Sequence, residues 1–351
     1  MKLGLDIAYS GAHLSLPVDR ILKAEALGFD SLWTAEAYGS DAFSPLAYVA
    51  ALTRRIRLAT GVAQLAARTP ANCAMTAQTI EELAGRGRVI VGLGVSGPQI
   101  VEGWYGQPWG KPATRMRDYV AILRKVWRRD GPVTHDGREI RLPYDGKGAY
   151  DEEGATGLAK PLKSILHGNP DIPVMLGTST PLAIRMTGEI ADGWLSMHMT
   201  PRSLPPRLRL LEEGFARRTD GRTAKGFEIV GMGQTVLTQD VRGAIDRAKA
   251  SVALYVGGMG AKDRNFHKDA MVDRGYAEAA ERIQTLFLAG HKAEAVAAVP
   301  DDYIDEAAII GPEARMAERY RAWADAGCTL LRCSNPSVET MEALARIARR
   351  A

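Results

Sequence analysis

The chain has 351 residues, of which 46% are hydrophobic and 25% are charged. This is the composition of an ordinary globular protein, and it excludes an intrinsically disordered or fibrous chain. The 45 basic residues exceed the 41 acidic ones by only four, without a long basic block, so we expect no nucleic-acid partner. No apolar run approaches the roughly 18 to 20 residues of a membrane helix, so we expect no membrane partner either.

Cysteine usage and the first residues indicate the compartment. The three cysteines Cys73, Cys328 and Cys333 form an odd set in a long chain, which is typical of reduced thiols. The first ten residues lack the unbroken hydrophobic stretch of a signal peptide. We therefore expect a cytoplasmic protein.

Short strand-like runs alternate with longer helical patterns from the third residue onward. Helical patterns cover residues 16–27, 45–52, 70–84, 116–127, 181–190 and 204–216, with further ones after Gly311-Pro312 and at the end of the chain. The predicted strands are residues 3–8, 31–35, 56–63, 88–95, 173–176, 193–196, 227–237 and 328–333. Two stretches depart from the alternation. Residues 131–171 are rich in Gly, Pro and charge, and residues 241–305 hold helical patterns without a strand.

Eight β/α units predict an α/β fold, a single-domain (β/α)₈ TIM barrel spanning residues 1–351, with insertions at about 131–171 and 256–305. An open, doubly wound sheet is the alternative. In a barrel of this kind the chemistry lies at the carboxyl ends of the strands, so the residues that follow each strand are the candidates for the site.

A glycine-rich segment ends the fourth predicted strand. Residues 92–97 read GLGVSG and match the GxGxxG pattern of dinucleotide-binding sites. The strand is not the first of the series, and Pro98 follows at once, so we interpret the segment differently. Its glycines allow a flat ring to approach the backbone closely. Gly94, Val95, Ser96 and Gly97 are therefore candidate cofactor-binding residues.

Two further strand ends carry polar or unusual residues. Gly177, Thr178, Ser179 and Thr180 join the fifth strand to a helix, where free N–H groups and the helix dipole favour an anion such as phosphate. An ordinary helix N-cap is the alternative interpretation. Gly61-Val62 interrupts the third strand, which is typical of a close ligand approach or of a simple bend.

The second strand is followed by Glu36 and Tyr38, either of which can exchange a proton at the barrel mouth. The six histidines show neither HxH nor HExxH spacing, so no metal site is predicted. The sequence also lacks a P-loop and a GxSxG elbow, which makes phosphoryl transfer and serine hydrolysis unexpected.

Taken together, these segments resemble the luciferase-like family of flavin and deazaflavin oxidoreductases. The most specific pieces are GVSGPQ and LYVGGMG, supported by IRLATGVAQLAARTP, LAKPLKSI, IPVMLGTSTPLAIRMTGEIADGW and WADAGCTLL. The resemblance covers nearly the whole chain. It is strongest to the branch that uses coenzyme F420, near the methylenetetrahydromethanopterin reductase-like members.

This resemblance implies a role for each segment. Gly61-Val62 matches the bulge whose non-prolyl cis peptide presses on the back of the tricyclic ring. Residues 94–97 match the strand that lies against the deazaflavin, and residues 177–180 match the turn that holds the coenzyme's phosphate. Glu36 matches an acidic position at the polar edge of the ring system. The implied cofactor is coenzyme F420, an 8-hydroxy-5-deazaflavin, with FMN as the alternative, and the implied assembly is a homodimer.

The sequence departs from the sugar-phosphate dehydrogenase branch at two positions. The histidine that serves there as base is replaced by Ala37, and the carboxylate after the fourth strand is replaced by Pro98-Gln99. We therefore do not expect sugar-phosphate oxidation. The predicted catalytic residues are Glu36 and Tyr38. The predicted substrate-binding residues are Gln99, Trp104, Lys262, Asn265 and Phe266, the last three from an insertion that either caps the site or forms a solvated loop.

The resulting hypothesis is an oxidoreductase that transfers a hydride between carbon 5 of the deazaflavin and a small organic substrate. Two alternatives stay open at this point. One is an FMN-dependent monooxygenase of the same family, and the other is a non-catalytic carrier of a flavin or deazaflavin.

Overall fold

The computed structural model describes residues 1–145, 156–260 and 265–350. Eight parallel strands form a closed barrel, because β10 pairs with both β9 and β12, and β12 pairs with β1. The barrel strands are β1 (Lys2–Ala8), β2 (Ser31–Thr34), β3 (Arg57–Thr60), β5 (Val89–Gly94), β8 (Val174–Gly177), β9 (Gly193–Leu195), β10 (Glu228–Leu237) and β12 (Leu330–Ser334). The predicted TIM barrel is confirmed, and the open-sheet alternative is wrong.

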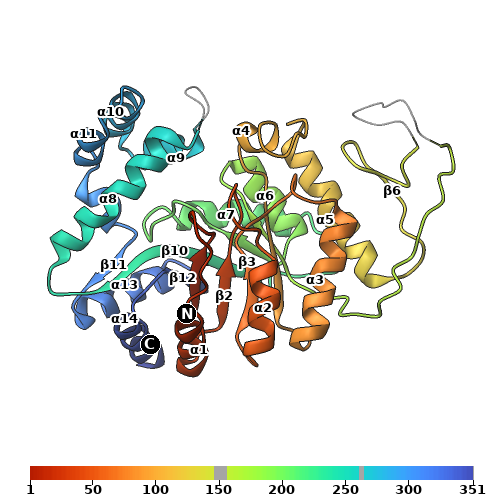
Figure 1. The fold of residues 1–351 in the computed structure, drawn as a ribbon, viewed down its shortest axis with the longest axis horizontal. Helices are drawn as coiled ribbons and strands as arrows, with labels where there is room; N and C mark the ends of the chain where they lie inside the picture. Colours follow the sequence, from red (N-terminus) through yellow and green to blue (C-terminus); the bar gives the residue numbers. More distant parts are fainter. Residues whose placement is uncertain (146–155, 261–264, 351) are drawn as a thin grey trace.

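Helices surround this barrel (Figure 1). They are α1 (Val18–Leu27), α2 (Ser44–Leu52), α3 (Pro70–Ala84), α5 (Pro112–Arg128), α6 (Pro181–Ile190), α7 (Pro205–Phe215), α13 (Glu313–Asp325) and α14 (Val338–Arg350). Local signals set their ends. Thr69 caps α3 by accepting a hydrogen bond from Asn72 N, and Gly28 ends α1 with a φ of 87°, which favours glycine.

The third predicted strand, residues 56–63, is divided in the structure. β3 ends at Thr60, and a two-residue strand, β4 (Ala63–Gln64), continues beyond a break at Gly61 and Val62 and pairs with β5. The sequence also did not predict β11 (Ile309–Gly311), which pairs with the last residues of β10, nor the four-residue helix α4 (Pro98–Val101). These elements are too short to show a hydrophobic period.

Both insertions contain structure of their own, at opposite sides of the molecule (Figure 1). The first holds a small hairpin of β6 (His135–Asp136) and β7 (Arg141–Leu142), and its residues 146–155 lie outside the described part. The second holds five helices: α8 (Val241–Gly258), α9 (Phe266–Asp273), α10 (Ala277–Leu288), α11 (Lys292–Ala297) and α12 (Asp301–Asp305). These helices enclose a hydrophobic cluster separate from the main core.

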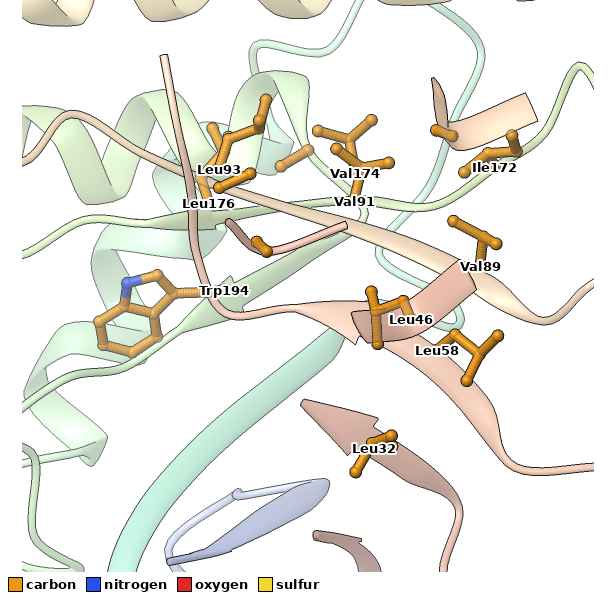
Figure 2. Packing of buried hydrophobic residues seen from close by; sticks show 14 of the residues in the cluster. Leu32, Leu46, Leu58, Val89, Val91, Leu93, Ile172, Val174, Leu176 and Trp194 are labelled. Carbon is orange, nitrogen blue, oxygen red and sulfur yellow. The ribbon is translucent and has the colours of Figure 1, made fainter. Parts of the chain in front are cut away.

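Alternation along the strands divides the core into two layers. Figure 2 shows Val89, Val91 and Leu93 of β5 beside Val174 and Leu176 of β8, all in the layer between strands and helices. A smaller cluster fills the barrel interior and includes Trp33, Ala59, Ile90, Met175, Leu195, Val230 and Leu330. Because successive side chains point to opposite faces, the residues of β5 and β8 nearest the carboxyl end on the interior side are glycines.

All three cysteines are buried and unpaired, as the odd count predicted. Burial raises the pKa of the Cys73 and Cys328 thiols to about 11, so both are unreactive at neutral pH.

Candidate active site at the barrel mouth

A platform without side chains lies at the barrel mouth, the end where the carboxyl termini of the strands meet. Gly94 of β5 and Gly177 of β8 are direct partners in the sheet. A Cβ atom added at Gly94 would lie 2.6 Å from Val62 Cγ2, and one added at Gly177 would lie 3.1 Å from Val62 Cγ1. Val62 therefore packs directly on this glycine platform, and larger residues at either position would displace it.

The Gly61-Val62 peptide bond is cis, as the family resemblance implied. Its surroundings require glycine, because a Cβ at Gly61 would lie 2.7 Å from Arg332 Nη1 and 2.8 Å from the Trp33 ring. Arg332 Nη2 donates a hydrogen bond to the Gly61 carbonyl at 3.1 Å and forms an ion pair with Asp6 at 3.0 Å. An ion pair inside the barrel thus supports the break in the third strand from below.

The segment after β5 lines the rim of the mouth. Val95 and Ser96 are partly exposed, and Ser96 adopts a φ of 60°. Gly97 packs on the Gln99 side chain, since a Cβ there would lie 2.4 Å from Gln99 Oε1. Gln99 is exposed, and its amide donates to the Met259 carbonyl at 2.8 Å.

The turn between β8 and α6 presents its polar groups at the same end. Thr180 is the N-cap of α6, and its hydroxyl accepts from Ala183 N at 3.3 Å. Thr178 is held by Trp194, whose ring N–H donates to the Thr178 carbonyl at 2.9 Å. Ser179 and Thr180 are exposed. The turn therefore combines the N-cap of the alternative interpretation with an open helix N-terminus suited to an anion.

Glu36 lies in the loop that follows β2, is only 6% exposed, and fixes this loop through hydrogen bonds. Its carboxylate accepts hydrogen bonds from Gln64 N at 2.7 Å and from Ala42 N at 3.0 Å. Arg68 binds both oxygens at 3.1 Å. These four bonds use the acceptor capacity of a carboxylate. The geometry does not support the predicted role of Glu36 in proton exchange or in contacting a ligand.

The last turn of α8 lies across the mouth. Met259 contacts two loops, through the bond from Gln99 and through its sulfur, which accepts from the Tyr38 hydroxyl at 3.5 Å. Tyr255 adds a third contact, with its hydroxyl 3.4 Å from that of Tyr9, which follows β1. Tyr38 remains 51% exposed and is the predicted proton-exchanging residue that stays accessible.

The predicted substrate-binding residues differ in their exposure to solvent. Asn265 is buried and caps α9, accepting from His267 N and Lys268 N and donating to the Tyr255 and Val256 carbonyls. Its polar atoms are thus used within the fold, which does not support a substrate contact. Phe266 and Trp104 are exposed, and Lys262 lies outside the described residues.

A pair of histidines was missed by sequence reasoning. His198 follows β9 at the mouth, and His267 lies on α9. Their rings are hydrogen-bonded, with His198 Nε2 2.8 Å from His267 Nδ1. Burial lowers the pKa of His198 to about 4 and that of His267 to about 3, so both rings are neutral at pH 7. No sequence signal joins two residues 69 positions apart, although a histidine directly after a barrel strand is a recognisable candidate.

Two cavities lie away from the mouth. One, of about 460 Å³, lies between α13 and α14 and is lined by Glu313, Arg321 and Ile347. The other, of about 320 Å³, lies at the amino ends of the strands, where its charged lining includes Arg57, Asp192 and Glu228. Arg57 pairs with Glu228 at 2.9 Å, and Asp192 pairs with Arg124 at 3.1 Å, which is typical of a stabilising network in this part of a barrel.

The fold and this mouth define a class of protein. Three features are typical of a barrel that binds a ligand at its mouth. The parallel barrel is closed, its third strand is broken where Val62 packs on the glycine platform, and a helical insertion lies across the mouth. The family model described as luciferase-like monooxygenase matches residues 4–330. The chain belongs to the luciferase-like family.

Particular relatives agree with this family. The chain is 44% identical, over 99% of both chains, to a Mycobacterium tuberculosis protein provisionally named a coenzyme F420-dependent oxidoreductase. It is 26% identical to 5,10-methylenetetrahydromethanopterin reductase of Archaeoglobus fulgidus, over 96% of this chain and 94% of that one. The predicted family is confirmed, and these relatives belong to the branch to which the sequence showed the strongest resemblance.

A solved structure agrees with the fold. The coenzyme F420-dependent tetrahydromethanopterin reductase of Methanopyrus kandleri superposes with a TM-score of 0.77 at 22% identity, covering 98% of this chain and 97% of that one.

The mouth fits a planar, anionic cofactor. Val62, seated on Gly94 and Gly177 and only partly buried, offers an apolar surface to a flat ring, and the α6 N-terminus after Gly177 supplies an anion site. Two buried polar atoms near the break in the third strand, Gln64 Oε1 and Arg332 Nε, have no partner among the described residues. Within the same described ranges, no group of three or more His, Cys, Asp or Glu side chains is arranged to hold a metal ion.

Proposed function

We propose that this protein is a coenzyme F420-dependent oxidoreductase that transfers a hydride between the deazaflavin and a small organic substrate at the barrel mouth. The observation that carries the proposal is the glycine platform of Gly94 and Gly177 packed on Val62, next to the α6 N-terminus. A flat ring with a phosphate-bearing tail needs this combination. The relative with 44% identity supports the choice of coenzyme.

In this proposal the chain mainly binds and orients. Bound there, the deazaflavin supplies a carbon that accepts or donates a hydride. Val62 supports one face of the ring, and Gly94 and Gly177 give the Val62 side chain the space that it needs. Ser179, with the first turn of α6, binds the phosphate. The last turn of α8 excludes water from the other side, which strengthens the electrostatic interactions within the site.

Fixing the two reactants in one geometry provides much of the rate, since proximity contributes about 7 to 11 kcal/mol in favourable cases. Tyr38 remains a candidate for proton exchange because its hydroxyl is exposed at the mouth. Gln99, Trp104 and Phe266 are the described residues that we propose to meet the substrate, since all three are exposed.

This function is tested by measuring catalytic turnover. The purified protein is mixed with reduced coenzyme F420 and a panel of small ketones, enones and iminium salts, and coenzyme oxidation is followed by absorbance. Hydride transfer to any member supports the proposal and excludes a non-catalytic carrier. Stoichiometric coenzyme binding without turnover favours the carrier.

The alternative of an FMN-dependent monooxygenase is distinguished from the proposed function by comparing the affinities for the two cofactors. We expect coenzyme F420 to bind more tightly than FMN in parallel fluorescence titrations. The reverse order, together with oxygen consumption in the presence of reduced FMN, contradicts the proposal and supports the monooxygenase.

We also propose a homodimer, located in the cytoplasm. The extended part of the first insertion exposes several large apolar side chains: Leu158, Leu162 and Ile165, the last being 91% exposed. We propose that these exposed side chains, close together in the sequence, are covered by a second copy of the chain. Replacing Ile165 and Leu162 by Glu is expected to shift a dimer to a monomer in sedimentation experiments. In the described part of the chain, no helix has both the length and the apolar character needed to cross a bilayer.

A further inference from the structure

The proposed reaction moves a proton as well as a hydride, and of the two proton-exchanging residues predicted from the sequence only Tyr38 stays accessible. Ala37 occupies the position of the histidine base of a related branch, and Glu36 is fully hydrogen-bonded within the protein. Reduction of a C=X bond by hydride leaves an anionic heteroatom that must be protonated. A group at the mouth that can exchange one proton without carrying a net charge would meet this need.

The described structure contains such a group in the histidine pair. We propose that His198 and His267 form a two-ring proton relay, in which His198 exchanges a proton with the substrate and His267 replaces it. The inference rests on the proposed function, because it assigns the proton step of that reaction. It is carried by the 2.8 Å bond between His198 Nε2 and His267 Nδ1 and by the position of His198 three residues beyond the carboxyl end of β9.

The surroundings hold the two rings in place. His267 is 5% exposed, and its ring makes an edge contact with Tyr255, at 4.7 Å between centroids, and stacks on Phe266. The His267 backbone is fixed by the Asn265 cap. His198 and His267 meet edge to face, with centroids 4.9 Å apart. This arrangement keeps one nitrogen of each ring on the shared bond.

Nearby charged and titratable groups favour neutral rings. Arg274 at the end of α9 repels a proton on His198, and it is itself paired with Glu306 at 3.0 Å. From α8, Tyr255 faces His267, and burial together with the Tyr9 hydroxyl raises the pKa of Tyr255, so it is a neutral phenol. In the part of the chain that the structure describes, neither ring is hydrogen-bonded to a carboxylate, which would trap a proton on it.

Two neutral imidazoles joined in this way have two arrangements of equal composition. In the first, His267 Nδ1–H donates to His198 Nε2, and His198 carries its proton on Nδ1. In the second, His198 Nε2–H donates to His267 Nδ1, and His267 carries its proton on Nε2. The first arrangement becomes the second when His198 Nδ1 loses a proton, the proton on the shared bond moves from His267 Nδ1 to His198 Nε2, and His267 Nε2 gains a proton.

The proposed step balances in atoms and charge. A bound reduced deazaflavin would supply the substrate carbon with a hydride, which carries both electrons, as the C=X π bond breaks, and would release its ring N–H proton to solvent. The heteroatom takes the proton from His198 Nδ1. His198 Nε2 then takes the proton of His267 Nδ1, and His267 Nε2 takes one from water. The hydroxide left by that water is neutralised by the proton that the oxidised coenzyme releases to solvent. Oxidation of the product runs through the same transfers in reverse, and exchange with water at both ends resets the pair.

The relay can first be tested without cofactor or substrate. Imidazole ¹⁵N shifts are measured by NMR in the ligand-free protein from pH 5 to 8, for the wild type, for His267→Gln and for the control His291→Gln, whose side chain is exposed. We expect both rings to be neutral throughout and the His198 nitrogens to shift in His267→Gln but not in the control. A positively charged ring at pH 6, or unchanged His198 shifts in His267→Gln, overturns the relay.

The second measurement uses hydride transfer from reduced coenzyme F420 to the panel of small acceptors. We expect kcat to fall about 10²- to 10⁴-fold in His198→Gln and less in His267→Gln, with the coenzyme dissociation constant within about twofold of wild type. The wild-type rate of reduction should be flat from pH 6 to 8. The His198→Gln rate should rise as pH falls, because solvent must then supply the proton, an effect that a purely structural histidine does not produce.

The outcomes separate the two proposals. Turnover with unchanged kcat and a flat pH profile in both variants overturns the relay and leaves the proposed function standing. A wild-type protein that binds coenzyme F420 but transfers no hydride overturns the proposed function, and the NMR result alone then decides whether the two rings form a coupled pair.

Discussion

Val62 and Gly94 share a space that holds only one side chain, because a Cβ at Gly94 would lie 2.6 Å from Val62 Cγ2. Gly94 belongs to β5, whereas Val62 lies in the break between β3 and β4. The contact therefore joins two strands at the point where the proposed cofactor ring lies.

Replacing Gly94 by Ala is expected to push Val62 out of place. Overpacking of this kind costs about 1 to 3 kcal/mol in the free energy of unfolding, and it should weaken coenzyme F420 binding as well. The double variant Gly94→Ala/Val62→Ala restores the space and should recover most of the stability. Urea unfolding and coenzyme titration measure both effects. Equal losses in the single and double variants would show that the clash does not involve Val62.

Replacing Ser179 by Asp should change stability and affinity in opposite directions. Ser179 directly precedes Thr180, the N-cap of α6, and a carboxylate this close to the helix N-terminus interacts favourably with the helix dipole, by about 0.3 to 1 kcal/mol. The variant should therefore be as stable as the wild type or more stable. The same charge repels a bound phosphate, and we expect coenzyme F420 to bind about tenfold more weakly.

The matched ligand for this variant is the tail-less 8-hydroxy-5-deazaflavin, which lacks the phosphate. Its affinity should be unchanged in Ser179→Asp. A uniform loss for both ligands would place the phosphate away from this turn.

Replacing Arg68 by Met leaves the Glu36 carboxylate buried without its cation. Removing one partner of a buried ion pair typically costs about 3 to 5 kcal/mol, which urea unfolding would detect readily. The control is Arg185→Met, which breaks the exposed pair with Glu213 and should change stability by about 0.5 kcal/mol or less. A cost below about 1 kcal/mol in Arg68→Met would contradict the assignment of Glu36 as a structural anchor.

The histidine pair should make stability depend on pH. In the unfolded chain the His198 and His267 imidazoles take up protons near pH 6.5, whereas in the folded protein they do so only near pH 4 and 3. The unfolded state therefore binds more protons as pH falls from about 6.5 toward 4, and the free energy of unfolding decreases across this window, by roughly 2 kcal/mol for each ring.

This contribution is isolated by the variant His198→Gln/His267→Gln. Urea unfolding at pH 7 and at pH 4.5 should show a smaller loss of stability in the double variant than in the wild type. The control His291→Gln should keep the wild-type slope. An unchanged slope in the double variant would mean that the two rings titrate normally in the folded protein.

Local patterns predicted most of the barrel. The strand-like run of residues 88–95 and the Thr69 cap depend on neighbours in the chain, and both appear in the structure as expected. The cis peptide at Gly61-Val62 was predicted only through the family resemblance and is present. The three-residue strand β11 was missed because it is too short to display a period.

The site was less predictable because its contacts join distant residues. Glu36 and Arg68 lie 32 positions apart, and no local pattern showed that the carboxylate would be neutralised. Asn265 could have been recognised as a helix cap, since an Asn directly before a helical pattern is a common N-cap. Composition and spacing gave no indication of the His198–His267 bond, which depends on the way α9 packs over the mouth.

The proposed function requires coenzyme F420 to bind against Val62 at the barrel mouth. We would examine this in a crystal structure of the protein grown with coenzyme F420. We expect the deazaflavin ring to pack on Val62, with its phosphate at Ser179 and the α6 N-terminus. A ring bound elsewhere on the molecule, or a phosphate remote from α6, would overturn this mode of binding.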